Sequence, residues 1–177
     1  CKGSQPTDGG NLIITESEYN DFIRREPSSI KYIRLFLGAD EFLNGKKRYC
    51  LWLVGASPKE LQAMPLVLER VKKVREFRQS SKKAATRKQA DTPTLFTENR
   101  QPLEVSSGTR RYIPMGFLNS NIICSNKLQL LPSASIYHFA VLMSNVHMAW
   151  MRSVCGRLKS DYDYSARIVY NNFPWST

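Results

Sequence analysis

The sequence predicts one α+β domain in which mixed β-strands pack on one long buried helix, about residues 133–155, with an additional basic helix over about residues 58–80. The length of 177 residues suits a single domain with a hydrophobic core. Hydrophobic residues make up 42% of the chain and charged residues 23%, which excludes wholesale disorder. The sequence contains no run of about 18 apolar residues, so it predicts no membrane-spanning helix. Short β-branched or aromatic runs predict the strands, and apolar residues at helical spacing predict the helices.

The first residues differ in composition from the rest. Residues 1–10 are polar and Gly-rich, so we expect a linker from a longer parent protein, followed by a single domain over residues 11–177. The β-branched run Leu12–Thr15 predicts a strand. Glu16–Arg25 predicts one or two helical turns before Pro27 interrupts them.

A strand pair is expected next. Ile30–Phe36 and Arg48–Val54 are two apolar, aromatic-rich runs, and Asn44-Gly45 between them is a tight-turn signal. We therefore expect a hairpin-like pair of strands in this part of the chain.

A helix should begin at Ser57, because Ser57-Pro58-Lys59-Glu60 combines a capping residue, Pro at the first helical position and Glu at the third. Pro65 is expected to divide or kink this helix. Gln79–Asp91 predicts either a second, weaker helix or an exposed connection.

The next segments predict a loop, two strands and a helix. Thr92–Gly108 is loop-like, and strands are expected at Arg111–Phe117 and Ile122–Leu131. From about Ser133 to Cys155 apolar residues occur at helical spacing and on other faces as well. A helix that is apolar nearly all round is expected to be the buried spine of the domain.

The net charge of +11 is concentrated in one stretch. Between Glu69 and Lys88 there are nine basic and two acidic residues, a local charge of +7. The basic residues of this stretch, called the basic block below, are Arg70, Lys72, Lys73, Arg75, Arg78, Lys82, Lys83, Arg87 and Lys88. Clustered Lys and Arg attract phosphates, so the block indicates a polyanionic partner, most simply nucleic acid. A solvated helix face or a tether explains the same charge equally well.

The segment RLKSDYDYS, Arg157–Ser165, alternates between charged and mostly apolar or aromatic positions. In an extended strand Lys159, Asp161 and Asp163 share one side, about 6.5 to 7 Å from neighbour to neighbour. The residues expected on the other side, anchored in the core, are Leu158, Tyr162 and Tyr164. Lys donates to O6 and N7 of guanine and a carboxylate accepts from N4 of cytosine, so Lys159 and Asp161 suit the two halves of one G·C pair. An ordinary solvated edge strand is the open alternative.

Four stretches carry a resemblance to a known family. They are EFLNGKKRYCLWL (Glu41–Leu53), RRYIPMGFL (Arg110–Leu118), HMAWMRSVCGRLKSDYDYS (His147–Ser165) and IVYNNFPW (Ile168–Trp175). Over about Gly9–Trp175 the sequence resembles the target-recognition domain of MmeI-like, type IIL restriction-modification proteins. Such proteins resemble a fusion of an adenine-N6 DNA methyltransferase, which uses S-adenosylmethionine, with a DNA-recognition domain and often an endonuclease. The resemblance implies a bacterial, cytoplasmic and nucleoid-associated protein whose partners are double-stranded DNA and the methyltransferase domain of the same polypeptide.

The resemblance also implies which residues contact bases. In the family the variable positions of a GRLxSxYxYS-like segment choose the bases, and they fall here on Lys159, Asp161 and Asp163. A further family position, in the strand before the long helix, aligns with Lys127 and cooperates with Asp163. Many relatives have Arg where this chain has Asp163, so the base contacted by this pair stays open, although Lys with Asp again suits a G·C pair.

The chain lacks the two loops that such a methyltransferase needs, a Gly-rich cofactor loop and an Asn-Pro-Pro-Tyr-like loop that holds the flipped adenine. NNFPW, Asn171–Trp175, has no adjacent prolines, and we interpret it as a packing turn at the exit of the domain. We therefore expect no cofactor in this chain, and S-adenosylmethionine in the catalytic domain of the parent.

The remaining reactive side chains favour structural roles. His138 and His147 lie nine residues apart on the predicted helix without a carboxylate or Cys at ligand spacing, so core or capping roles are expected. The four cysteines form no Cys-x-x-Cys pair, which indicates free thiols in an intracellular protein. We expect neither catalytic nor metal-binding residues.

Two hypotheses follow. In the first, the chain is a sequence-specific DNA recognition module in which Lys159, Asp161, Asp163 and Lys127 contact base edges. The expected phosphate-binding residues are Arg157, Arg70, Lys72, Lys73, Arg75, Arg78, Lys82 and Lys83. In the alternative, the chain is a structural or protein-interaction domain whose basic helix docks on an acidic surface of the parent enzyme.

Overall fold

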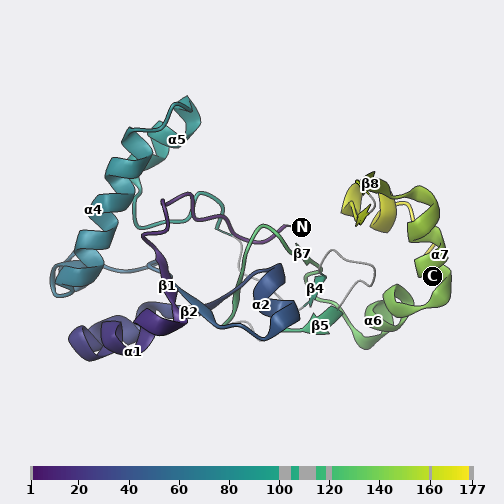
Figure 1. Ribbon diagram of the computed structural model, residues 1–177, viewed down its shortest axis with the longest axis horizontal. Helices are drawn as coiled ribbons and strands as arrows, with labels where there is room; N and C mark the ends of the chain where they lie inside the picture. Colours follow the sequence, from purple (N-terminus) through teal and green to yellow (C-terminus); the bar gives the residue numbers. More distant parts are fainter. Residues whose placement is uncertain (1, 100–104, 108–114, 119–120, 160, 176–177) are drawn as a thin grey trace.

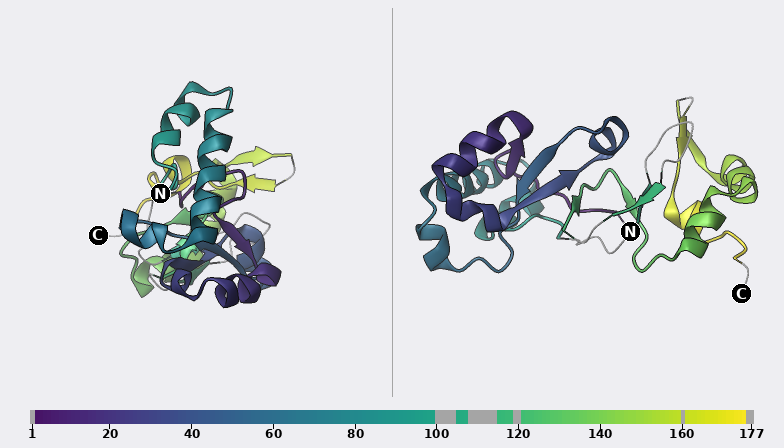
Figure 2. Two further views of the ribbon diagram at one scale, coloured as in Figure 1. Left: turned by 90° about the vertical axis from the view of Figure 1, so that its left-hand side faces the viewer. Right: turned by 90° about the horizontal axis from the view of Figure 1, so that it is seen from below.

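The structure is a computed structural model that describes residues 2–99, 105–107, 115–118, 121–159 and 161–175. The molecule is elongated (Figure 1). Helices and strands from the first half of the chain lie at one end of the long axis, and the elements from residue 136 onward lie at the other, as the right-hand view of Figure 2 also shows. Helices together with parallel and antiparallel strands confirm the predicted α+β class.

A four-stranded sheet lies in the N-terminal part. Its order is β1 (Ile13–Thr15), β3 (Arg48–Leu51), β2 (Ile33–Leu37) and β6 (Ile123–Cys124), with β6 parallel to β2 and the other pairs antiparallel. The antiparallel pairing of β2 with β3 confirms the predicted strand pair. The expected tight turn is wrong, because the connection contains helix α2 (Ala39–Asn44) and Gly45, with φ +66°, ends that helix. The carboxylate of Glu41 accepts hydrogen bonds from Gly38 N and from Arg48, which joins α2 to β3.

Helices from the first half of the chain pack on this sheet or on one another. They are α1 (Glu16–Arg25), η1 (Pro27–Tyr32), α3 (Pro58–Gln62), α4 (Pro65–Gln79), α5 (Ala84–Lys88) and η2 (Gln89–Asp91). Capping boxes at Thr15 and Ser57 begin α1 and α3. Pro65 separates α3 from α4, as predicted. Of the two alternatives for residues 79–91, the structure shows the short helices.

The largest core cluster joins these helices to the sheet. Buried members include Ile14, Phe22, Leu51, Val67 and Val74. Val67 and Val74 lie on the inner side of α4, whereas the side chains of Lys72, Lys73 and Arg75 on the same helix are exposed. The apolar spacing of α4 therefore directs much of the basic block to solvent.

The expectation that residues 1–10 form a linker is wrong for residues 2–10, which pack into the fold. Isolated bridges pair Lys2, Ser4 and Gln5 with later segments of the chain. Ser4 is buried, and a Cβ on Gly3 would lie 2.4 Å from the carbonyl oxygen of Cys124. Asp8 is also buried and accepts hydrogen bonds from the backbone N–H groups of Gly10 and Leu12. The polar residues that predicted a linker instead form hydrogen bonds within the fold.

A second, antiparallel sheet follows along the chain. Its order is β5 (Met115–Phe117), β4 (Val105–Ser107) and β7 (Gln129–Leu130). β5 bears out the end of the strand expected at Arg111–Phe117, whose residues 111–114 lie outside the described residues. β4 corrects the expected loop at 92–108. The strand expected at 122–131 is divided into β6 and β7, which belong to different sheets.

The C-terminal unit differs most from expectation. It consists of α6 (Ile136–Met143), α7 (Asn145–Val154), the strands β8 (Gly156–Leu158) and β9 (Asp161–Asp163), and the π-helical η3 (Ala166–Tyr170). The single long helix is wrong, because Ser144 adopts an extended conformation and its hydroxyl accepts a hydrogen bond from His147 N, which starts α7 anew. The expected burial is wrong as well, since Ile136 is 71% exposed and Val146 69%.

No helix among the described residues has the length and apolar character needed to cross a bilayer.

Candidate nucleic-acid interface

The segment with alternating charges forms a β-hairpin. β8 and β9 pair antiparallel, with Leu158 opposite Asp161. Lys159 is exposed and lies in the turn between the strands with φ +58°, a left-handed conformation that is uncommon outside Gly, Asn and Asp. The expectation of one extended strand is therefore wrong, because the chain reverses direction after Leu158. Lys159 lies at the tip of the hairpin instead of in line with the two aspartates.

The aspartates of β9 share one face of the hairpin. Residues directly opposite each other in an antiparallel pair project to the same side. Asp161 and Asp163 therefore lie on one face, and Arg157 and Tyr162 lie on the other. Both aspartates are exposed, as the alternation predicts. Leu158 lies on the face of the aspartates and is 72% exposed, which corrects its expected place beside Tyr162.

Arg157 is exposed and contacts the aromatic ring opposite it. Its Cζ lies 4.5 Å from the centroid of the Tyr162 ring, and Nη2 donates to the Tyr162 hydroxyl at 3.3 Å. A guanidinium stacked on a ring keeps its charge while its position is restricted. Arg157 is thus held on the face of the hairpin that the aspartates do not occupy.

Lys127 lies apart from the hairpin residues. It is exposed in the turn between β6 and β7, and its backbone N–H donates to the hydroxyl of Ser125. Among the described residues, the structure contains no ion pair between Lys127 and Asp163. It therefore brings Lys159, Asp161 and Asp163 together but leaves Lys127 on a different part of the fold.

The exposed members of the basic block lie on α4, on α5 and between them. They are Lys72, Lys73, Arg75, Lys82, Lys83, Arg87 and Lys88. Lys73 pairs with Glu69 at 2.7 Å and thereby lowers the pKa of that carboxyl group. Arg87 donates to the carbonyls of Ser81 and Lys82. In Figure 1, α4 and α5 lie at the opposite end of the long axis from β8.

Arg70 and Arg78 are used inside the fold. Arg70 donates through Nη1 to the carbonyls of Asn11 and Ile13 and through Nη2 to Glu18. Arg78 is fully buried, and burial lowers the pKa of its guanidinium. Its nitrogens donate to five backbone carbonyls, those of Pro6, Thr7, Gln89, Thr92 and Leu95. Since a guanidinium has five N–H donors, Arg78 has none left for a phosphate.

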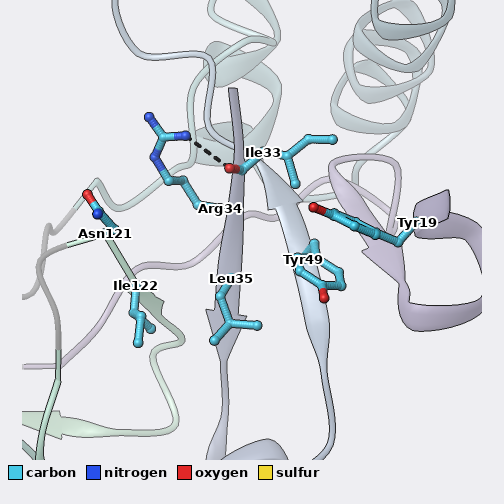
Figure 3. Close-up of a pocket in the computed structure, with 7 residues that line it drawn as sticks. All are labelled: Tyr19, Ile33, Arg34, Leu35, Tyr49, Asn121 and Ile122. Atoms are coloured by element: carbon cyan, nitrogen blue, oxygen red, sulfur yellow. Dashed lines mark hydrogen bonds between the residues drawn. The ribbon is translucent and has the colours of Figure 1, made fainter. Parts of the chain in front are cut away.

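An open pocket of about 470 Å³ lies beside the four-stranded sheet (Figure 3). It is lined by Tyr19, Ile33, Arg34, Leu35, Tyr49, Asn121 and Ile122. The rings of Tyr19 and Tyr49 stack with centroids 4.0 Å apart, and Arg34 donates to the carbonyls of Lys31 and Ile33. In the sequence, the aromatic-rich runs Ile30–Phe36 and Arg48–Val54 mark this region, but they predicted strands and not a pocket. None of the predicted base-contacting residues lines it.

The thiols and imidazoles occupy structural positions. Cys50 and Cys124 are buried free thiols, and burial raises the pKa of Cys124 to about 12, which opposes formation of a nucleophilic thiolate. His138 accepts a hydrogen bond from Ser135 N at the start of α6, so its role is a cap. His147 is buried on α7 and contacts Phe173 of the NNFPW segment, with ring centroids 4.7 Å apart. No group of metal-ligating side chains occurs among the residues that the structure describes.

Comparisons with known proteins bear on this surface. The whole chain, residues 1–177, matches the family described as MmeI, target recognition domain. DNA methyltransferase A of Bacillus subtilis (strain 168) is 41% identical over 179 residues, which cover 97% of this chain and 20% of that protein. The solved structure of the type IIL restriction-modification enzyme MmeI in complex with DNA is 49% identical, with a TM-score of 0.93, over 99% of this chain and 24% of that chain. The chain therefore spans only about a fifth to a quarter of the length of these relatives.

Proposed function

Because the chain belongs to the MmeI target-recognition-domain family, we propose that it is the sequence-specific DNA recognition module of a larger adenine-N6 DNA methyltransferase of the restriction-modification type, and that it catalyses no step itself. The observation that carries this proposal is the TM-score of 0.93, at 49% identity, to an enzyme solved in complex with DNA. The exposed hairpin supports it, since the major groove of B-DNA admits a two-stranded β-ribbon.

In the proposed complex the tip and the acidic face of the hairpin contact base edges. Lys159 donates to guanine and Asp161 accepts from cytosine, which together select a G·C pair. Asp163 acts on another base pair, which Lys127 contacts from a different part of the fold, the turn between β6 and β7. Carboxylates repel phosphates, so Asp161 and Asp163 are favourable only inside a groove, where they face amino groups of bases. Their presence on one exposed face supports base contact over backbone contact.

Phosphate contacts supply affinity that does not depend on sequence. The residues proposed for this role are Arg157, Lys72, Lys73, Arg75, Lys82 and Lys83, all of which are exposed. Arg70 and Arg78 are left out, because their donors already serve the fold. The basic block and the hairpin lie at opposite ends of the molecule, so a duplex that contacts both follows the long axis (Figure 1).

The chemistry belongs to the rest of the parent protein. In this proposal the catalytic domain of the parent binds S-adenosylmethionine and the flipped adenine, and the recognition module chooses the site. The parent works in the bacterial cytoplasm, on the nucleoid.

The test exchanges the charges of the hairpin in the full-length parent. Lys159→Glu combined with Asp161→Arg reverses the donor and acceptor at one base pair, so the set of methylated sites in the genome should change at a single position of the recognised sequence. Lys72→Ala is the control, because a phosphate contact alters affinity but not sequence preference. An unchanged recognised sequence in the charge-exchanged protein contradicts the proposal.

A second candidate, a protein-interaction domain, is favoured by the distance of the basic block from the hairpin (Figure 1). In that case α4 and α5 dock on an acidic surface of the parent. Salt titration separates the two. Phosphate contacts predict that duplex affinity falls steeply with salt, and that Lys72→Ala makes the fall less steep. A salt dependence that Lys72→Ala and Lys82→Ala leave unchanged favours protein docking.

A further inference from the structure

A buried polar pair lies directly behind the hairpin. His147 of α7 is fully buried, and its Nε2 lies 3.1 Å from the hydroxyl of Tyr164, which is only 8% exposed. Tyr164 is the residue that follows Asp163 at the end of β9. The hydrogen bond therefore joins a helix of the C-terminal unit to the strand that carries both aspartates.

The imidazole depends on this one contact. Nδ1 of His147 is buried without a hydrogen-bond partner among the described residues, so the interaction of Nε2 with Tyr164 is the polar contact that its ring makes there. Burial lowers the pKa of His147 and raises that of Tyr164, so both are neutral at neutral pH. A neutral hydrogen bond between buried groups is directional, and losing it leaves a buried polar atom unsatisfied.

The helix end of the pair is itself fixed. The backbone N–H of His147 donates to the hydroxyl of Ser144 at the start of α7, and the His147 ring packs on the Phe173 ring in a T-shaped arrangement. Trp150, one turn further along α7, donates from Nε1 to the carbonyl of Val169 at 2.9 Å. α7 is thus held against the segment that follows the hairpin, and the His147 imidazole has one defined position.

Apolar contacts complete the cluster. Met151 and Val169 pack with Tyr164, and such contacts tolerate small displacements because dispersion has no preferred direction. Side chains alternate along a strand, so the orientation of Tyr164 is coupled to that of Asp163 and Asp161. A bond that fixes the Tyr164 hydroxyl therefore limits rotation of the acidic face relative to α7.

The geometry points to His147 and Tyr164 as positioning residues that set the orientation of the base-contacting hairpin, an inference that rests on the proposed function. Neither side chain touches DNA in this arrangement. Their hydrogen bond holds the hairpin in one orientation, and polar contacts to base edges tolerate little misplacement. The preference for the recognised sequence is therefore greater than it would be if the same side chains lay on a loosely held hairpin.

The test measures discrimination, defined as the affinity of the full-length parent for its recognised duplex divided by its affinity for duplexes altered at one base pair. Tyr164→Phe removes only the hydroxyl, and His147→Leu removes the polar ring at similar size. Each should lower discrimination about tenfold, the equivalent of one hydrogen bond, and leave affinity for unrelated DNA unchanged. Tyr19→Phe in α1, which keeps the ring that stacks on Tyr49, is the matched control and should have no effect.

The double variant separates positioning from stability. Each single change leaves one buried polar group unpaired and lowers the thermal midpoint, whereas Tyr164→Phe with His147→Leu removes both groups, so the midpoint recovers. The inference expects discrimination in the double variant to stay about tenfold low. Discrimination that recovers with the midpoint, or that no variant alters, overturns it.

The charge exchange at Lys159 and Asp161 distinguishes failure of the positioning role from failure of the proposed function. If Lys159→Glu with Asp161→Arg changes the recognised sequence and Tyr164→Phe leaves discrimination intact, only the positioning role is overturned. If the charge exchange has no effect, the proposed function fails and the positioning role fails with it.

Discussion

The Cζ of Arg157 lies 4.5 Å from the centroid of the Tyr162 ring, on the face of the hairpin opposite Asp161. Cation–π contact restricts the guanidinium to that face. A hairpin that lies in a groove of DNA has phosphates at its margins and base edges at the floor of the groove. The face with the cation therefore suits the phosphates, and the face with the carboxylates suits the base edges.

Arg157→Ala should lower affinity for every duplex by a similar factor and make the plot of log affinity against log salt less steep by about 0.9, as expected for one lost phosphate contact. The recognised sequence should not change. Salt titration of DNA binding measures both quantities. Arg24→Ala on α1, where the side chain is 80% exposed, is the control and should leave the slope as it is. A shift in sequence preference would show that Arg157 contacts bases instead.

Two substitutions at Lys159 should distinguish its role in the backbone conformation of the turn from its role in base contact. Its φ of +58° costs a β-branched residue about 1–2 kcal/mol, whereas Asn tolerates this region. Lys159→Asn should therefore preserve the thermal midpoint but favour adenine over guanine at the contacted position, and Lys159→Val should lower both stability and affinity. Thermal unfolding together with binding to a panel of duplexes checks this. Equal midpoints for the two variants would contradict the role of the turn.

Local signals in the sequence predicted local structure well. The capping box at Ser57 and the division at Pro65 depend on neighbouring residues, and both are present. Alternation predicted that Asp161 and Asp163 share a face, because that relationship holds within one strand.

Features that depend on distant residues were not predictable in the same way. The turn at Lys159 has no Gly or Asn to signal it, and only pairing of β8 with β9 reveals it. The charge of Arg78 predicted a surface position. In the structure its guanidinium is instead buried among five carbonyls from two separate segments, residues 6–7 and 89–95. The apolar stretch after Ser133 indicated burial, but Ser144 divides it into two helices.

Arg78→Ala should destabilise the chain by about 3–5 kcal/mol, since it removes a fully buried guanidinium and leaves five backbone carbonyls without their donors. Arg78→Lys should recover little of this loss, because an ammonium has three donors and no planar fork. Chemical denaturation measures the change. Lys72→Ala on the exposed side of α4 should stay within about 0.5 kcal/mol. If Arg78→Ala alters DNA affinity at full stability, Arg78 has a binding role after all.

Acid should weaken the C-terminal unit through His147. Burial holds its pKa below the ordinary value of 6.5, so the unfolded chain binds the proton more readily than the folded chain. This contribution to stability is complete above about pH 6.5 and is lost as the pH falls toward the folded pKa. Denaturation between about pH 7.5 and about pH 5 should show a slope that His147→Leu flattens and His138→Ala retains. Identical slopes in both variants would assign the effect to other groups.

Two apolar residues of α6 should differ sharply in their contribution to stability. Ile136 is 71% exposed and Leu142 only 5%, although both belong to the same apolar run. Ile136→Ser should change the free energy of unfolding of this chain by no more than about 0.5 kcal/mol, because little apolar surface is lost from the core. Leu142→Ala should cost about 2–5 kcal/mol through the lost burial and the cavity that it leaves. A large cost for Ile136→Ser would mean that α6 packs by the face that is exposed in the structure, and would restore the single buried helix that the sequence predicted.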